Sequence, residues 1–107
     1  MRQFLTRYQF YLMALVLLLI TFAAYHGVLR SSFISYDDDK YVSDNPLLKA
    51  GLPIAGVKWA FTTFEQANWH PLTWLSYMVD KGLYGLNPHG FHLTNLLFHL
   101  ANTLLLL

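Results

Sequence analysis

Hydrophobic and polar positions divide the chain into two apolar ends and a mixed middle. Between Arg7 and Arg30 lie 22 residues without a formal charge. A helix of that length reaches roughly 33 Å at about 1.5 Å per residue, enough to cross a bilayer. The pattern therefore predicts a transmembrane helix over residues 8–29, preceded by a short N-terminal segment, residues 1–7. A cleaved signal peptide is the alternative, because Arg2 and Arg7 supply a basic start and "TFAAYHG" supplies small residues.

A second apolar segment covers residues 90–107 and ends in four leucines. Pro88 can open this helix, since the first helical turn has no use for its missing N–H. The 17 residues from Phe91 to Leu107 fall short of the ~20 that cross a membrane. We expect a second transmembrane helix cut within its length, so that the chain is a fragment of a multispanning protein.

Polar side chains recur within this second segment at spacings of three, four and three: His92, Asn95, His99 and Asn102. That spacing places them on one face of a helix. Because polar groups in lipid need partners, we expect this polar stripe to pack against another helix. A metal site from His92 and His99 is a weaker alternative, since the two lie two turns apart.

The middle of the chain, residues 30–89, is predicted to be one extramembrane loop. After turns at "NPLLKAGLP", apolar positions indicate two short amphipathic helices, near residues 53–65 and 71–84. Pro71 and Gly85 mark the start and end of the second helix. Such helices can lie in the membrane interface or pack on other parts of the protein. The predicted fold class is an all-α membrane protein.

Composition agrees with this class. The chain is 55% hydrophobic and 12% charged, against about 25% charged residues in soluble domains. A net charge of +1 without a basic run argues against nucleic acid as a partner, and the lack of cysteine excludes disulfides and thiolate chemistry. The distribution of Lys and Arg leans weakly towards a cytoplasmic N-terminus and an outer loop.

Three consecutive carboxylates, Asp37, Asp38 and Asp39, lie seven to nine residues beyond Arg30. A solvated turn explains them without any function. If the stretch is extended, Asp37 and Asp39 point one way and Asp38 the other. A carboxylate at the bilayer face is also suited to be a general base, and a divalent cation such as Mg or Mn is a further way to relieve the repulsion.

His70 precedes Pro71 at the mouth of the second predicted amphipathic helix. Free N–H groups and the helix dipole favour anions there, so a phosphate-binding role is physically reasonable. A histidine that is hydrogen-bonded at a loop corner is an equally good interpretation.

Three stretches carry a resemblance: "FISYDDDKYVSDNPLL", "GVKWAFTTFEQANWHPLTWLSYMVD" and "LYGLNPHGFHLTNLLFHLANTLLLL". From Phe33 onward the chain resembles the N-terminal part of bacterial membrane proteins that join a GT-C type glycosyltransferase domain to tetratricopeptide repeats. These proteins are similar to the transmembrane and tetratricopeptide repeat O-mannosyltransferases and, more distantly, to the protein O-mannosyltransferases.

The resemblance implies an integral enzyme of the bacterial inner membrane, with its loop on the periplasmic or outer side. It would transfer a sugar from a polyprenyl-phosphate donor to a protein hydroxyl. The acidic pair of this family falls on Asp37 and Asp38 as catalytic base, with Asp39 a neighbour of undetermined role, and the donor-phosphate position falls on His70. The fragment alone is expected to be inactive, since it lacks the remaining transmembrane helices and the repeats. The competing hypothesis is a non-catalytic membrane anchor or scaffold that mediates protein–protein assembly.

Overall fold

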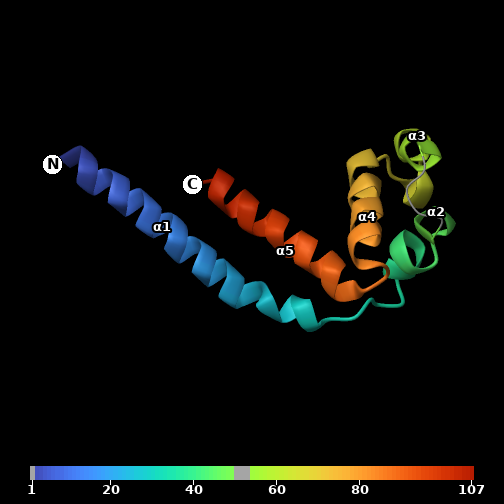
Figure 1. The fold of residues 1–107 in the computed structure, drawn as a ribbon, viewed down its shortest axis with the longest axis horizontal. Coiled ribbons are helices and arrows are strands. Elements are labelled where there is room, and N and C mark those ends of the chain that lie inside the picture. The colour runs from blue at the N-terminus through green and yellow to red at the C-terminus, as the bar shows by residue number, and fades with distance from the viewer. Residues whose placement is uncertain (1, 50–53) are drawn as a thin grey trace. The chain divides into compact units, whose positions relative to one another are not determined.

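The structure, a computed structural model, describes residues 2–49 and 54–107, and these residues form five α-helices joined by short 3-10 and π turns. The predicted all-α class is thus confirmed. The chain divides into two compact units (Figure 1). Unit 1 combines the N-terminal residues up to Arg30 with His92–Leu107, and unit 2 comprises Ser31–Phe91.

The first helix, α1, spans Arg2–Tyr25 and continues as the 3-10 helix η1, His26–Arg30. Its leucines and alanines are strong helix formers. At its end the His26 ring donates from Nδ1 to the Ala23 carbonyl at 2.8 Å, which satisfies one of the carbonyls that a helix end leaves open. The proton is assigned to Nδ1 because a carbonyl only accepts.

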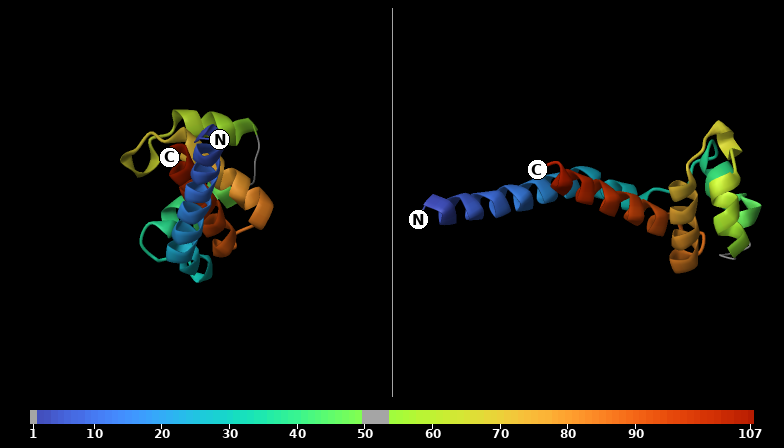
Figure 2. Two further views of the ribbon diagram at one scale, coloured as in Figure 1. Left: turned by 90° about the vertical axis from the view of Figure 1, so that its left-hand side faces the viewer. Right: turned by 90° about the horizontal axis from the view of Figure 1, so that it is seen from above.

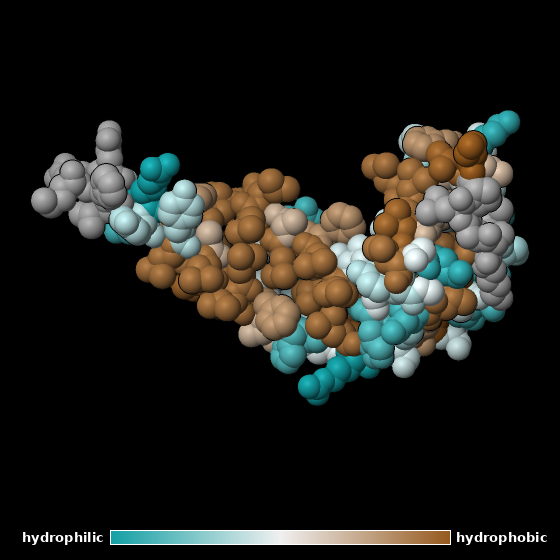
Figure 3. Space-filling model, in the orientation of Figure 1, coloured by the Kyte–Doolittle hydropathy of each residue, from teal (hydrophilic) through white to brown (hydrophobic). Residues whose placement is uncertain are grey.

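A single helix among the described residues is long and apolar enough to cross a membrane, over Thr6–Arg30. An 18-residue window of this helix has a mean hydropathy of 2.2, and none of the residues in the window is buried. A signal sequence near the N-terminus has the same properties. In Figure 3, apolar side chains cover the visible face of unit 1.

The last helix, α5, spans Pro88–Leu105, so Pro88 opens it as predicted. Within unit 1, Tyr25 of α1 meets His99 of α5 edge to face, with ring centroids 4.7 Å apart. A small cavity of about 170 Å³ lies beside this pair and is lined by Val28, Asn95 and Leu96 as well.

Unit 2 contains the π-helical turn η2 (Asp39–Ser43), α2 (Pro46–Lys49), α3 (Ile54–Thr62), the 3-10 turn η3 (Glu65–Ala67) and α4 (Pro71–Tyr84). Helices α2 and α3 both pack on α4, and α2 also packs on η2 (Figure 2). The core is Leu48, Ala60, Trp74 and Met78, with the rings of Tyr41, Trp59 and Tyr77 against it. The elements η2, α2, α3 and α4 therefore each supply at least one side chain to a single cluster around Trp74.

Local signals explain the two ends of α4. His70 is the residue before the helix, with φ −142°, and Pro71 opens it. Gly85 ends it at φ +65°, a left-handed conformation that favours glycine. At the turn into α5, Gly90 lies so close to the Tyr84 ring that a Cβ atom would overlap it.

Two loop predictions differ from the structure. The stretch predicted as turns forms α2 over Pro46–Lys49, while residues 50–53 lie outside the described part. Helix α3 ends at Thr62, earlier than expected, and four residues later Gln66 and Ala67 adopt positive φ angles of 58° and 59° at η3.

Candidate functional site

The acidic stretch forms a compact turn. The Ile34 N–H donates to Asp38 Oδ2 at 2.9 Å, and the Asp37 carbonyl accepts from the N–H groups of Lys40 and Tyr41, both at 3.0 Å. Asp44 N–H closes the π turn on the Asp39 carbonyl at 2.7 Å. Aspartate favours such turns because its side chain competes for nearby backbone N–H groups.

This geometry corrects the extended arrangement considered for the three aspartates. In a strand Asp37 and Asp39 would share one face, but in the turn Asp37 is exposed while Asp38 and Asp39 are both half-buried. The side chains of the neighbours Asp38 and Asp39 are therefore both partly covered by the rest of the protein. The hydrogen bond from Ile34 fixes the orientation of the Asp38 carboxylate.

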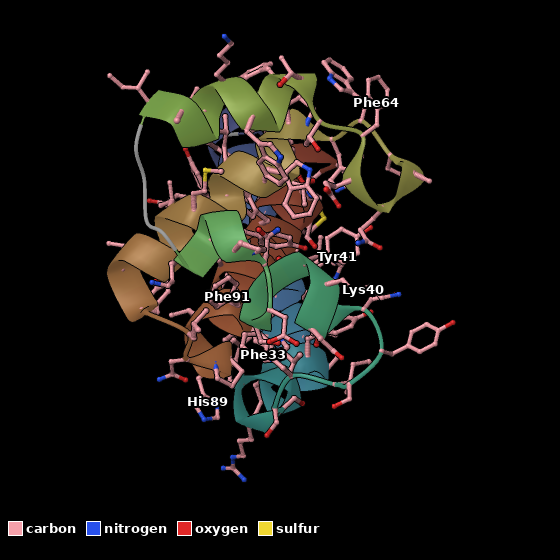
Figure 4. All side chains as sticks on the ribbon, turned by 90° about the vertical axis from the view of Figure 1, so that its right-hand side faces the viewer. Phe33, Lys40, Tyr41, Phe64, His89 and Phe91 are labelled. Carbon is pink, nitrogen blue, oxygen red and sulfur yellow. The ribbon has the colours of Figure 1, made fainter. Side chains whose placement is uncertain are left out.

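Tyr41 connects the acidic turn to α4. Its ring stacks on Trp74, with centroids 5.3 Å apart and planes 20° apart, and lies 5.7 Å from the ring of His70. It also meets Tyr77 edge to face at 6.4 Å. Positions 70, 74 and 77 lie on one side of α4, since residues three and four apart are neighbours on a helix. In Figure 4, Tyr41 lies over α4, while the side chain of the adjacent Lys40 extends outward.

Two motifs that are separate in the sequence thus meet at one ring. The last aspartate, Asp39, lies two residues before Tyr41, and His70 lies against the same ring and stacks on Trp74 at 5.0 Å. Trp74 is fully buried and also packs on Trp59 of α3 at 4.9 Å. Each aromatic pair adds about 0.5–1.5 kcal/mol beyond the area it buries, so the cluster holds the acidic turn beside His70.

The cluster contains two buried nitrogen atoms, Nε2 of His70 and Nε1 of Trp74, that have no hydrogen-bond partner among the residues that the structure describes. A buried polar atom without a partner costs about 1–3 kcal/mol. Such atoms in native structures call for a specific reason, and an oxygen-bearing ligand or a water is one.

His70 also forms part of the wall of an apolar recess of about 370 Å³, together with Phe61, Trp69, Pro71, Leu72 and Thr73. A second recess of about 360 Å³ has a more polar lining that includes Lys40, Asp44 and Glu65. His70 thus contacts the aromatic cluster and also lines an apolar recess that is suited to hydrocarbon.

Sequence reasoning missed three residues near the turn: Tyr41, Tyr77 and Asp80. Burial raises the pKa of the Tyr77 hydroxyl above its usual 10.0, and the charges of Asp38, Tyr41 and Asp80 raise it further. Asp80 is 3% exposed. Its position three residues after Tyr77 on α4 was the only available signal, and a lone aspartate in an amphipathic helix is normally taken as solvent-facing.

The described residues do not fit the proposed Mg or Mn site. No group of three or more His, Asp or Glu side chains in the described ranges is placed to hold a metal ion. Asp37 faces solvent, and the Asp38 carboxylate already accepts a backbone N–H. No step of the chemistry below passes through a cation.

The polar stripe of α5 is only partly engaged. His92 is half-buried, and Asn95, His99 and Asn102 are exposed. Within unit 1, His99 contacts Tyr25 and Asn95 lines the small cavity beside it. Packing of the whole stripe against another helix stays a prediction.

Comparison with known proteins identifies no relative: no family model, curated protein or solved structure matches the chain.

Proposed function

We propose that this chain is part of an integral-membrane glycosyltransferase of the GT-C type, which transfers a sugar from a polyprenyl-phosphate donor to a protein hydroxyl. Helix α1 is its first transmembrane helix, unit 2 lies at the outer face of the bacterial inner membrane, and α5 enters the membrane as a second span. The observation that carries the proposal is the position of His70. It lies against Tyr41, beside the acidic turn, and also forms part of the wall of an apolar recess.

The two sides of His70 match the two halves of the donor. A polyprenyl phosphate joins a hydrocarbon chain to an anionic head group, so it needs an apolar surface next to a hydrogen-bond donor. The apolar recess can take hydrocarbon, and the buried His70 Nε2 has no partner within residues 2–49 and 54–107. In this role a protonated Nε2 donates to a phosphate oxygen and stabilises the charge that develops there.

The reaction we propose uses the acidic turn as the base. The hydroxyl oxygen of the acceptor attacks the sugar C1 while the C1–O bond to phosphate breaks. Asp38 takes the hydroxyl proton, the electron pair of the broken bond leaves with the polyprenyl phosphate, and the configuration at C1 inverts. Asp38 is the better base of the pair because its hydrogen bond to Ile34 holds the carboxylate in place. Asp37, which is exposed, is positioned to contact the acceptor.

Substitution of the acidic pair tests the proposal in the complete protein, assayed in membranes with a labelled polyprenyl-phosphate sugar. Asp38→Asn keeps the acceptor for Ile34 N–H but removes the base, so transfer should fall by about 10²–10⁴-fold. Asp39→Asn is the matched control, because it makes the same charge change one residue later and the π turn uses only the Asp39 carbonyl. Full activity of both Asp38→Asn and Asp37→Asn would contradict a catalytic turn and favour a scaffold.

Topology is tested separately. The chain has no cysteine, so Tyr36→Cys introduces a single thiol at a side chain that is 76% exposed. A membrane-impermeant maleimide should label it from the outer side of intact cells. Labelling only after the cells are opened would place the acidic turn in the cytoplasm and refute the mechanism. Loss of an N-terminal tag from the membrane-bound product would identify α1 as a cleaved signal sequence.

A further inference from the structure

Unit 2 carries an exposed apolar edge where α3, η3 and the start of α4 meet. Four large side chains form it, Phe61, Phe64, Trp69 and Leu72, with exposed fractions of 48%, 70%, 58% and 74%. Phe61, Trp69 and Leu72 line one recess and so lie close together. Figure 4 shows Phe64 at the outer rim of this part of the unit, and Figure 3 shows apolar atoms exposed there.

The side-chain polar groups of Thr62, Thr63 and Trp69 at this edge have hydrogen bonds within the chain, whereas Nε2 of His70, on the wall of the same recess, has none among the described residues. The Trp69 indole N–H donates to the Phe61 carbonyl at 2.9 Å, and the Thr62 hydroxyl donates to the Lys58 carbonyl at 2.9 Å. The Thr63 hydroxyl accepts the Glu65 N–H at 3.1 Å. In lipid each unsatisfied polar group costs several kcal/mol, so internal pairing is what allows such an edge to leave water.

Charged groups are arranged to stay outside. Glu65 lines the polar recess together with Lys40 and Asp44, and none of the described residues that line the apolar recess is an Asp, Glu, Lys or Arg. Lys58 is exposed on α3, one helical turn before Phe61. A lysine beside an inserting apolar surface can extend its ammonium group to lipid phosphates.

The chain itself brings this edge to a bilayer. Helix α1 and η1 end at Arg30, and unit 2 begins at the next residue, Ser31. With α1 in the membrane, unit 2 is tethered at its surface, and tethering makes even a modest apolar contact persistent. Tryptophan and phenylalanine are side chains that favour the boundary between head groups and acyl chains.

We propose that the apolar edge inserts into the interfacial layer of the bilayer that holds α1, with Phe64 and Trp69 at the boundary between head groups and acyl chains. This contact orients unit 2 on the membrane. It goes beyond the transfer reaction and does not depend on it, since a non-catalytic protein with the same edge would insert equally.

Fluorescence quenching in vesicles tests the insertion. Phe64→Cys gives the whole chain one thiol at an exposed position, and Lys40→Cys is the matched control on the polar recess. Each variant is labelled with an environment-sensitive dye and reconstituted into phosphatidylcholine vesicles, with or without bromine on the acyl chains. The dye at position 64 should shift to the blue, be quenched by the brominated lipid and lose quenching by aqueous iodide. The dye at position 40 should remain open to iodide.

Two outcomes would overturn the proposal. Equal iodide quenching at both positions, with no effect of brominated lipid, would place the edge in water. Protection of position 64 from both quenchers would show that protein covers the edge. Neither result bears on the Asp38→Asn assay, so the failure of this inference is distinguishable from the failure of the proposed function.

Discussion

Replacing Tyr41 with alanine should release the acidic turn from α4. Tyr41 is the one side chain of η2 whose ring contacts His70, Trp74 and Tyr77, and its backbone N–H is bound to the Asp37 carbonyl at the start of the turn. The substitution removes all three ring contacts and leaves the aspartates unchanged. Its effect therefore measures how strongly the aromatic cluster holds the acidic turn.

The structure sets the size of the effect. Truncation of a fully buried aromatic side chain to alanine costs about 3–5 kcal/mol. Tyr41 is half-buried, so about half that cost, ~2 kcal/mol, is expected for the docked turn. At 1.4 kcal/mol for each factor of ten, the released form should become about 30-fold more populated. Tyr41→Phe keeps the ring and should change this population by less than about threefold.

Hydrogen exchange of the whole chain in lipid nanodiscs measures this population. The amides of Ile34, Tyr41 and Asp44 donate to hydrogen bonds within the turn, so they should exchange about 30-fold faster in Tyr41→Ala than in the wild type. Amides in the second half of α4 should keep their rates, which separates local release from unfolding of unit 2. If the amides of residues 34–44 exchanged at the same rate in Tyr41→Ala as in the wild type, the role assigned to the Tyr41 ring would be refuted.

Four further substitutions test other parts of the structure. Gly90→Ala should destabilise unit 2 by about 1–3 kcal/mol because the new Cβ overlaps the Tyr84 ring, whereas Gly82→Ala, in open space inside α4, should stabilise it by up to ~1 kcal/mol. Thermal unfolding followed by near-ultraviolet circular dichroism compares the two, and equal melting temperatures would contradict the overlap. The raised pKa of Tyr77 means that the unfolded chain ionises there first, so stability should be intact below pH 10 and fall as the pH rises above it. Tyr77→Phe should remove that part of the alkaline loss, and an identical pH profile in the variant would refute it. His70→Phe keeps the ring on Trp74 and deletes the unpartnered Nε2, so it should leave folding intact while transfer falls; a variant that unfolds, or one that transfers normally, would argue against the phosphate role.

Local sequence signals predicted the parts of the fold that local physics controls. An uncharged run of sufficient length gave α1, and Pro71, Gly85 and Pro88 marked helix ends that the structure places at those residues. These features depend on backbone donors, fixed φ angles and side-chain solvation within a few residues. No partner distant in the sequence is needed to produce them.

Contacts between distant residues could not be predicted in this way. The stacking of Tyr41 on His70 and Trp74 joins residues about thirty positions apart, and no periodicity in either stretch encodes it. The positive φ angles of Gln66 and Ala67 could not be predicted from the sequence either, because neither residue is among those that favour positive φ. Both features involve parts of unit 2 that meet only in the folded chain: η2 meets α4 through Tyr41, and η3 connects α3 to α4, which pack on each other.

The π turn at Asp39–Ser43 has a consequence for how this region tolerates change during evolution. A π turn accommodates one residue more than an α-turn between the same hydrogen-bonded ends. Deleting Lys40 would let an ordinary α-turn form, but it would rotate the side chains that follow by about 100° around the helix axis. Tyr41 would then turn away from Trp74 even though each remaining residue kept its identity. Insertions and deletions in this stretch should consequently be rarer among homologous chains than substitutions, since its length governs the register of the ring more than its composition does.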